Sequence, residues 1–215
     1  NNTNQFSEEP EYIDGLMGIC QFDCDLIASI AEALQIYGPM YTMGGTCTSA
    51  GLALRSAITE INYNDCDLAI TGGGCIDYSP LSYQALIVIS AISYVNFNES
   101  PEMASRPYDT QREGFVPSHG SGILIVEDLE HAKKRNAKIY AEIVGISLNC
   151  GGQRQGGSMT APNPRGVQNC IKTALREANI NGKDIDYING HLTGTFADPV
   201  EIKNWAEALE LTPET

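Results

Sequence analysis

The segment whose residue types are best suited to catalysis spans residues 41–61. There, Cys47 follows a pair of glycines and precedes an apolar helical pattern. The pattern predicts a short strand over 41–43, a glycine turn and a helix over 49–61. A thiol at a helix amino terminus meets unpaired N–H groups and the positive end of the dipole, which stabilise the thiolate. Cys47 is therefore the candidate nucleophile; the alternative is a small buried residue at a tight join. The small residues that leave room for a substrate carbonyl beside it are Gly44, Gly45, Ala50 and Gly51.

A thiolate nucleophile needs a histidine partner, and the sequence holds three. His131 lies in the charged turn EHAKKRN and is predicted to be solvated, whereas His119 is predicted to close a loop before a strand. His191 ends the apolar segment IDYINGH, which predicts a position at the carboxyl end of a strand, where α/β folds place their sites. Two hydroxyls follow it, from Thr193 and Thr195. His191 is therefore the candidate catalytic partner.

The elements that must position these residues alternate between helical and strand patterns, which is typical of an α/β layered fold. Helices are predicted over 25–36, 49–61, 81–91, 129–136, 164–178 and 199–209. Strands are predicted over 67–71, 122–127, 138–147 and 186–188. The first and last of these are predicted to be buried, and the second and third could pair as neighbours. The polar stretch 96–120 is the longest irregular connection, and a glycine-rich loop is predicted over 151–157.

Composition narrows the class of protein. The net charge of −14 repels polyanions, so nucleic-acid binding is not expected. Seven cysteines, an odd count without a CxxC pair, favour reduced thiols and a cytoplasmic location. No apolar run approaches the length of a membrane span, and residues 1–10 show no signal-peptide pattern. Cys20 and Cys24 lack companion ligands at metal spacing, so no zinc site is expected.

Four motifs resemble those of the beta-ketoacyl synthases, the condensing enzymes of fatty-acid and polyketide assembly. GGTCTSAG is similar to the nucleophile turn of that family, and the segment from ASRPYDTQREGF to AKIYAEIVG follows its central signature. GGSMTAPNP resembles its substrate-side loop, and GHLTGTFADPVE resembles its first catalytic-histidine motif. The motifs occur in the order of the family and span most of residues 37–205.

The resemblance implies a thiolase-like layered α-β-α fold, present in part. Residues 1–148 would form the amino-terminal half without its first elements, and residues 149–215 the beginning of the carboxyl-terminal half. It implies that Cys47 accepts an acyl group from an acyl carrier protein or coenzyme A, and that His191 assists decarboxylation of a malonyl-thioester. Thr193 and Thr195 would hydrogen-bond the pantetheine arm, and the Cys47 N–H would form half of an oxyanion hole. The resemblance implies no metal or other cofactor. It implies that the protein is a homodimer.

The sequence also departs from the family pattern. Leu192 stands where the family usually has glycine, and His119 with Gly120 replaces a more usual acidic-glycine pair. Val95 and Asn96 fall where a basic carrier-docking residue is expected. The second catalytic histidine of the family, the lysine before it and the glycine-rich closing loop are not found after His191.

Three functions therefore stay open. The first is a beta-ketoacyl synthase that completes its catalytic set outside this sequence. The second is a thiolase-fold acyltransferase that works without decarboxylation, which the HLTGT motif disfavours. The third is a noncatalytic partner subunit of a synthase heterodimer, in which the cysteine is typically replaced; Cys47 and His191 together speak against it.

Overall fold

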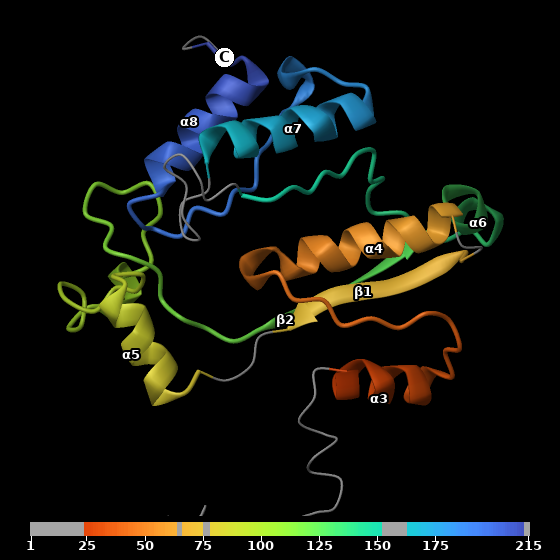
Figure 1. The fold of residues 1–215 in the computed structure, drawn as a ribbon, viewed down its shortest axis with the longest axis horizontal. Helices are drawn as coiled ribbons and strands as arrows, with labels where there is room; N and C mark the ends of the chain where they lie inside the picture. The colour runs from red at the N-terminus through yellow and green to blue at the C-terminus, as the bar shows by residue number, and fades with distance from the viewer. Residues whose placement is uncertain (1–23, 64–65, 75–77, 152–162, 213–215) are drawn as a thin grey trace, which may run out of the picture. The chain divides into compact units, whose positions relative to one another are not determined.

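The computed structural model describes residues 24–63, 66–74, 78–151 and 163–212 (Figure 1). Its helices are α3 (Cys24–Leu34), α4 (Ser49–Tyr63), α5 (Pro80–Val88), α6 (Leu129–Lys134), α7 (Pro164–Ala178) and α8 (Asp198–Leu209). Short 3-10 turns are η2 (Thr46–Thr48), η3 (Pro101–Met103) and η4 (Gly182–Asp184), and the strands are β1 (Leu68–Gly74) and β2 (Ser121–Glu127). The chain forms two compact units. The first holds the described residues up to Gly72 together with Leu124–Asp128; the second holds Gly73–Ile123 and the described residues from Leu129 onward.

The two strands pair with each other, and the contacts at their ends show that they run antiparallel. Asp128 donates its N–H to the Asp67 carbonyl at 2.9 Å at one end of the pair. At the other end, a Cβ on Gly74 would lie 3.7 Å from the Ser121 Cβ. The prediction of strands at 67–71 and 122–127 is therefore confirmed, but the expected pairing of 122–127 with 138–147 is wrong.

The apolar side chains of β2 are largely exposed. Ile123, Leu124 and Ile125 keep 58%, 55% and 64% of their surface exposed. In β1 only Thr71 is buried. A strand buries both of its faces only when further layers cover them, and the sheet formed by the described residues has two strands. An apolar strand pattern indicates that a strand can be buried. Whether it is buried depends on the layers that pack against it.

Helices α7 and α8 contact each other in the second unit and lie side by side in Figure 1. The Gln168 amide donates to Asn204 Oδ1 at 3.1 Å and to Glu207 Oε2 at 2.5 Å, joining the two helices. Ala208 and Leu209 are buried on α8. The predicted bounds of α7 are confirmed because its caps are local: the Asn163 side chain accepts the Arg165 N–H, and the helix ends at a left-handed asparagine, Asn179.

Three predicted strands are not formed in the described structure. Residues 41–43, 138–147 and 186–188 adopt no strand pairing. The end of the second segment is instead held along α7. The Ile146 N–H donates to Glu177 Oε2 at 3.2 Å, and the Cys170 thiol donates to the Ser147 carbonyl at 3.2 Å. A strand requires a paired neighbour, and here side chains of a helix take that place. The predicted loop over 151–157 lies almost wholly outside the described residues.

Candidate functional site

Cys47 lies in the middle of η2, immediately before α4, and its thiol is exposed. Ser49 holds this turn from both sides: its hydroxyl accepts the Gly45 N–H at 2.9 Å and donates to the Thr46 carbonyl at 2.7 Å. The Gly45 carbonyl accepts the Thr48 hydroxyl at 2.7 Å and the Thr48 N–H at 3.0 Å. Since the first N–H groups of a helix have no partners within it, the turn presents Cys47 beside donors for an anion. The predicted position at a helix amino terminus is confirmed.

The backbone around Cys47 is constrained at two adjacent residues. Thr46 has φ 50°, a left-handed conformation that a β-branched residue rarely adopts. A Cβ on Gly45 would overlap the end of the Leu52 side chain and come within 2.9 Å of the Thr48 hydroxyl, so a larger residue there would have to displace Leu52. Gly44 and Gly51 have nothing within 4 Å of that position. Of the three glycines predicted to make room at the turn, only Gly45 has other atoms within 4 Å of the position that a Cβ would take.

His191 begins a loop, residues 191–198, that precedes and enters α8. Its N–H donates to Glu201 Oε1 at 2.7 Å, and the next N–H, that of Leu192, donates to Glu201 Oε2 at 2.9 Å. Glu201 lies in the first turn of α8, where the dipole favours a carboxylate. Gly190 lies so close to Trp205 and Glu201 that no side chain would fit there. His191 is exposed and is positioned by α8, so its predicted place at the end of a strand is wrong for the described residues.

Leu192 adopts φ 30°, in the left-handed region. This is the position at which the resemblance predicted glycine. A leucine there costs backbone strain that glycine would avoid, and the Glu201 carboxylate holds the strained N–H in place.

The two predicted thioester-binding threonines lie together in the 191–198 loop. Thr193 Oγ1 and Thr195 Oγ1 are 3.1 Å apart. Asp198, only 1% exposed, holds the backbone between them: its carboxylate accepts the N–H of Gly194 and that of Thr195, each at 3.2 Å. The same carboxylate accepts the Tyr108 N–H at 3.2 Å, which joins this loop to a distant segment. One buried carboxylate thus satisfies three backbone donors.

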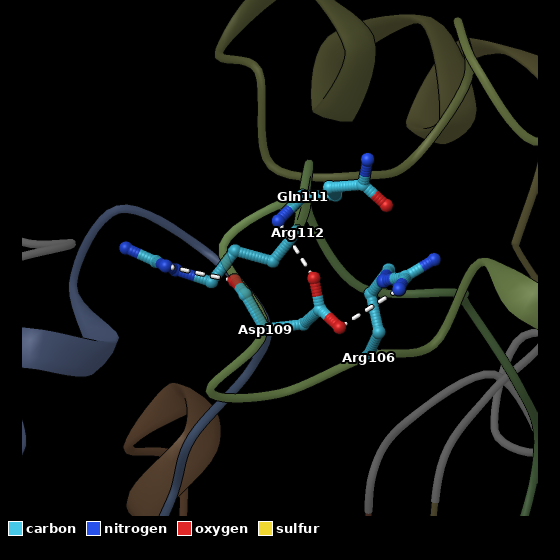
Figure 2. Close-up of polar contacts among 4 residues, drawn as sticks. All are labelled: Arg106, Asp109, Gln111 and Arg112. Atoms are coloured by element: carbon cyan, nitrogen blue, oxygen red, sulfur yellow. Dashed lines mark hydrogen bonds and ion pairs between the residues drawn. The ribbon is translucent and has the colours of Figure 1, made fainter.

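That distant segment, residues 106–115, carries a compact polar cluster (Figure 2). Arg106 donates to Asp109 Oδ2 at 2.7 Å, and the Gln111 N–H donates to Asp109 Oδ1 at 2.7 Å. The hydrogen bond from Arg106, followed by that from Gln111, holds the pKa of Asp109 below its usual range. Arg112 donates through its Nη1 to the Asp109 carbonyl at 2.9 Å. The sequence predicted an irregular connection here, and the structure shows one stabilised by its own side chains.

Glu113 forms a second hub in the same segment. Its carboxylate accepts the Ser93 hydroxyl at 2.5 Å, the Val95 N–H at 3.2 Å, and both the backbone N–H and the side-chain amide of Asn96. Desolvation acts to raise the pKa of Glu113, but the hydrogen bonds from Ser93, Asn96 and Val95 outweigh it and leave that pKa lowered. Glu113 thereby fixes the backbone at Val95 and Asn96, the positions at which a basic docking residue was expected.

The structure brings together some of the predicted site residues. His191, Thr193 and Thr195 share one loop of the second unit, whereas Cys47 belongs to the first unit, so its pairing with His191 stays a prediction. His119 lies before β2 with its ring 5.9 Å from the Tyr78 ring, consistent with closing a loop. In the GGSMTAPNP motif, residues 156–162 lie outside the described part of the chain.

Sequence reasoning missed four residues that build the site: Arg112, Glu113, Asp198 and Glu201. The acidic pair in the ADPVE run offered a signal, because acids in a first helical turn accept N–H groups. Arg112 and Glu113 offered none, because Arg112 Nε donates to the Thr195 carbonyl, 83 residues away, and Glu113 accepts from Ser93, 20 residues away.

Among the described residues, no group of three or more histidine, cysteine or acidic side chains is placed to hold a metal ion. Within the same residues, none of the helices has the length and apolar character needed to cross a membrane.

Comparison with known proteins gives matches along almost the whole chain. Residues 2–132 match the family model "Beta-ketoacyl synthase, N-terminal domain", and residues 140–214 match "Beta-ketoacyl synthase, C-terminal domain". A 3-oxoacyl-[acyl-carrier-protein] synthase 2 of Rhizobium meliloti (strain 1021) is 37% identical over 170 residues, covering 78% of this chain and 39% of the relative. The polyketide biosynthesis malonyl-ACP decarboxylase PksF of Bacillus subtilis (strain 168) is 32% identical over 200 residues, covering 93% of this chain and 47% of that protein.

A solved structure supports the fold. The ketosynthase complex AntDE:AntF, described as a type II polyketide synthase acyl-carrier protein in complex with its ketosynthase bound to the hexaketide, is similar with a TM-score of 0.81. The identity is 27%, and the match covers 93% of this chain and 48% of that one. The expected thiolase-like α/β fold, present in part, is confirmed. The chain spans less than half the length of these relatives, and it belongs to the beta-ketoacyl synthase family.

Proposed function

We propose that this chain carries the nucleophile and the first histidine of a beta-ketoacyl synthase, which condenses a malonyl-thioester with an acyl group held on Cys47 in fatty-acid or polyketide biosynthesis. The observation that supports the proposal most is the exposed Cys47 thiol in a constrained turn at the start of α4. A thiol so placed is suited to attack a thioester carbonyl.

In the first half-reaction, the Cys47 sulfur attacks the carbonyl of an acyl-thioester. A sulfur–carbon bond forms, the carrier thiol leaves with a proton, and the acyl group stays on Cys47. The negative charge on the carbonyl oxygen in the transition state is stabilised by the Cys47 N–H as one of two donors. The Ser49 hydroxyl, bonded to Gly45 and Thr46, keeps this turn in shape.

In the second half-reaction, a malonyl-thioester loses carbon dioxide. The bond to the carboxylate breaks, and its electron pair is left on the α-carbon as an enolate, with charge on the thioester oxygen. His191 donates a hydrogen bond to that oxygen, and Glu201 holds the backbone from which His191 projects. The α-carbon then attacks the acyl carbonyl, and the Cys47 thiolate leaves.

The substrates are carried on phosphopantetheine, so no further cofactor is required. Thr193 and Thr195 hydrogen-bond the pantetheine arm through hydroxyls 3.1 Å apart. The partner is an acyl carrier protein, which the solved ketosynthase complex supports by likeness. We further propose a homodimer in the cytoplasm, with no role for nucleic acid in a chain of net charge −14.

A second candidate is decarboxylation of malonyl-thioester without condensation. One relative that matches 93% of this chain is named a malonyl-ACP decarboxylase. The exposed Cys47 favours condensation, because decarboxylation alone requires no acyl acceptor.

The test uses the full-length protein with an acyl-carrier thioester and intact-protein mass spectrometry. One acyl adduct is expected in the wild type and in Cys150→Ala, which removes another exposed thiol, but not in Cys47→Ala. For His191→Ala, acylation is expected to survive while release of carbon dioxide from malonyl-thioester falls. Release of carbon dioxide without an adduct would favour the decarboxylase, and an adduct without consumption of malonyl-thioester would favour a transferase. Neither adduct nor release would indicate a noncatalytic subunit.

A further inference from the structure

The backbone carbonyls of Gly194 and Thr195 accept hydrogen bonds from the 106–115 segment. The Gly114 N–H donates to the Gly194 carbonyl at 2.9 Å, and Arg112 Nε donates to the Thr195 carbonyl at 2.7 Å. Asp198 holds the N–H groups of the same residues, Gly194 and Thr195. The short run that carries both hydroxyls is therefore held on its donor side by a carboxylate and on its acceptor side by Arg112 and Gly114.

Arg112 is itself held in one orientation. Its Nη1 donates to the Asp109 carbonyl at 2.9 Å while its Nε reaches Thr195, so one planar guanidinium spans two backbone carbonyls 86 residues apart in sequence (195 − 109). Asp109 is fixed in turn by Arg106 and by the Gln111 N–H, as Figure 2 shows. Gly114 does not tolerate a side chain, because it has φ 126° and a Cβ there would meet the Ala91 carbonyl oxygen at 2.5 Å.

The two hydrogen bonds, from Gly114 and from Arg112, differ in whether a substitution can remove them. The Gly114 contact is a backbone bond that no side-chain change removes, whereas the Arg112 contact depends on one guanidinium. Without it, the Thr195 carbonyl loses its charge-assisted donor and keeps only the longer bond from the Asp198 N–H at 3.3 Å. The Thr195 N–H and hydroxyl keep their bonds to Asp198 Oδ1 and to the Ala197 N–H, so the position of the Thr195 hydroxyl is less firmly held but not free.

We propose that Arg112 is a positioning residue for the hydroxyls of Thr193 and Thr195, acting through the Thr195 carbonyl; this inference rests on the proposed function, in which those hydroxyls bind pantetheine. Arg112 does not contact the reacting atoms in this scheme. Groups that hold the arm equally in the ground state and the transition state affect KM more than kcat. The consequence should therefore appear only with substrates that carry the arm.

The test compares two thioesters of the same acyl group in the acylation of Cys47 in the full-length protein. One is carried on coenzyme A, which has the pantetheine amides, and the other on ethanethiol, which has none. For Arg112→Gln, the KM for the coenzyme A thioester should rise about tenfold with kcat within about twofold. The rate constant kcat/KM for the ethanethiol ester should change by less than about twofold, because it cannot use the threonines.

Arg106→Gln is the matched control. Arg106 donates to Asp109 in the same cluster, but its guanidinium lies over the Phe97 ring, 5.0 Å from the ring centroid, and does not bond Thr195. Because Arg106 acts on Arg112 only through Asp109, Arg106→Gln should change the ratio of the two kcat/KM values by less than Arg112→Gln does. Arg112→Lys keeps the charge and the aliphatic part of the side chain but not the set of planar N–H donors. The ratio of the kcat/KM values for the two thioesters should therefore change about threefold. This variant decides the question if Arg112→Gln does not fold, as judged by circular dichroism.

The inference would be overturned, while the proposed function stands, if the ratio of the two kcat/KM values is unchanged in both Arg112→Lys and Arg112→Gln. It would also be overturned if Arg106→Gln changes that ratio as much as Arg112→Gln does. Failure of the wild-type protein to acylate Cys47 with either thioester would refute the proposed function, and the inference with it.

Discussion

The buried carboxylate of Asp198 offers the most direct test of how the 191–198 loop is held. Its two oxygens accept three backbone N–H groups, from Tyr108, Gly194 and Thr195, each at 3.2 Å. Asp198 is 1% exposed, so water cannot readily replace a lost acceptor. Removal of the carboxylate would leave buried donors unpaired at the point where two distant segments meet.

The expected magnitude follows from the number of bonds lost. In Asp198→Asn one oxygen remains, which can keep the two bonds that Oδ2 accepts, while an amide NH₂ faces the third donor. A hydrogen bond to a charged group contributes roughly 1.5–3 kcal/mol, so this variant should lose about 2 kcal/mol of stability. Asp198→Ala loses all three acceptors, and removal of a buried charge offsets part of that loss, so about 4 kcal/mol is expected.

The assay combines urea unfolding of the full-length protein with hydrogen exchange. Exchange should speed up selectively in peptides that contain Tyr108, Gly194 and Thr195. Asp184→Asn is the matched control, because Asp184 also accepts a backbone N–H, that of Asn181 at 2.8 Å, but at an exposed position. A loss below about 1 kcal/mol in Asp198→Ala, or exchange no faster than in the control, would refute the reasoning.

Three further outcomes follow from local geometry. At Leu192, with φ 30°, glycine should be more stable than alanine by about 1 kcal/mol in thermal unfolding, the reverse of the usual order; alanine as the more stable variant would contradict the left-handed backbone. Gly45→Ala should cost roughly 1–3 kcal/mol and slow alkylation of Cys47 by iodoacetamide, because the new methyl group meets Leu52, while Gly44→Ala should be tolerated; equal effects would refute the argument. The lowered pKa of Glu113 means that its contribution to stability is present above the ordinary value of 4.5 and is lost as the pH falls through the lower folded value. In acid unfolding followed by fluorescence, Glu113→Gln should therefore lose less stability over that range than the wild type, and parallel curves would show that the carboxylate contributes nothing.

The sequence predicted those elements whose signals are local. The bounds of α7 were predicted from its apolar period and from the proline at its start, and both signals act within a few residues. Cys47 was placed at a helix start because glycines precede it and an apolar period follows. The three predicted strands that the described structure lacks had the right composition, but a strand exists only when another backbone accepts its hydrogen bonds.

The sequence by itself determined the residue types that can do chemistry, Cys47 and His191, and their order along the chain. The tertiary structure alone decided how the 191–198 loop is held: Arg112 reaches Thr195 over 83 residues, and Asp198 reaches Tyr108 over 90. Local patterns report turns, caps and periodicity, because these depend on residues a few positions apart. Contacts between distant loops leave no such pattern, since any buried polar group can be satisfied by whichever segment folds against it.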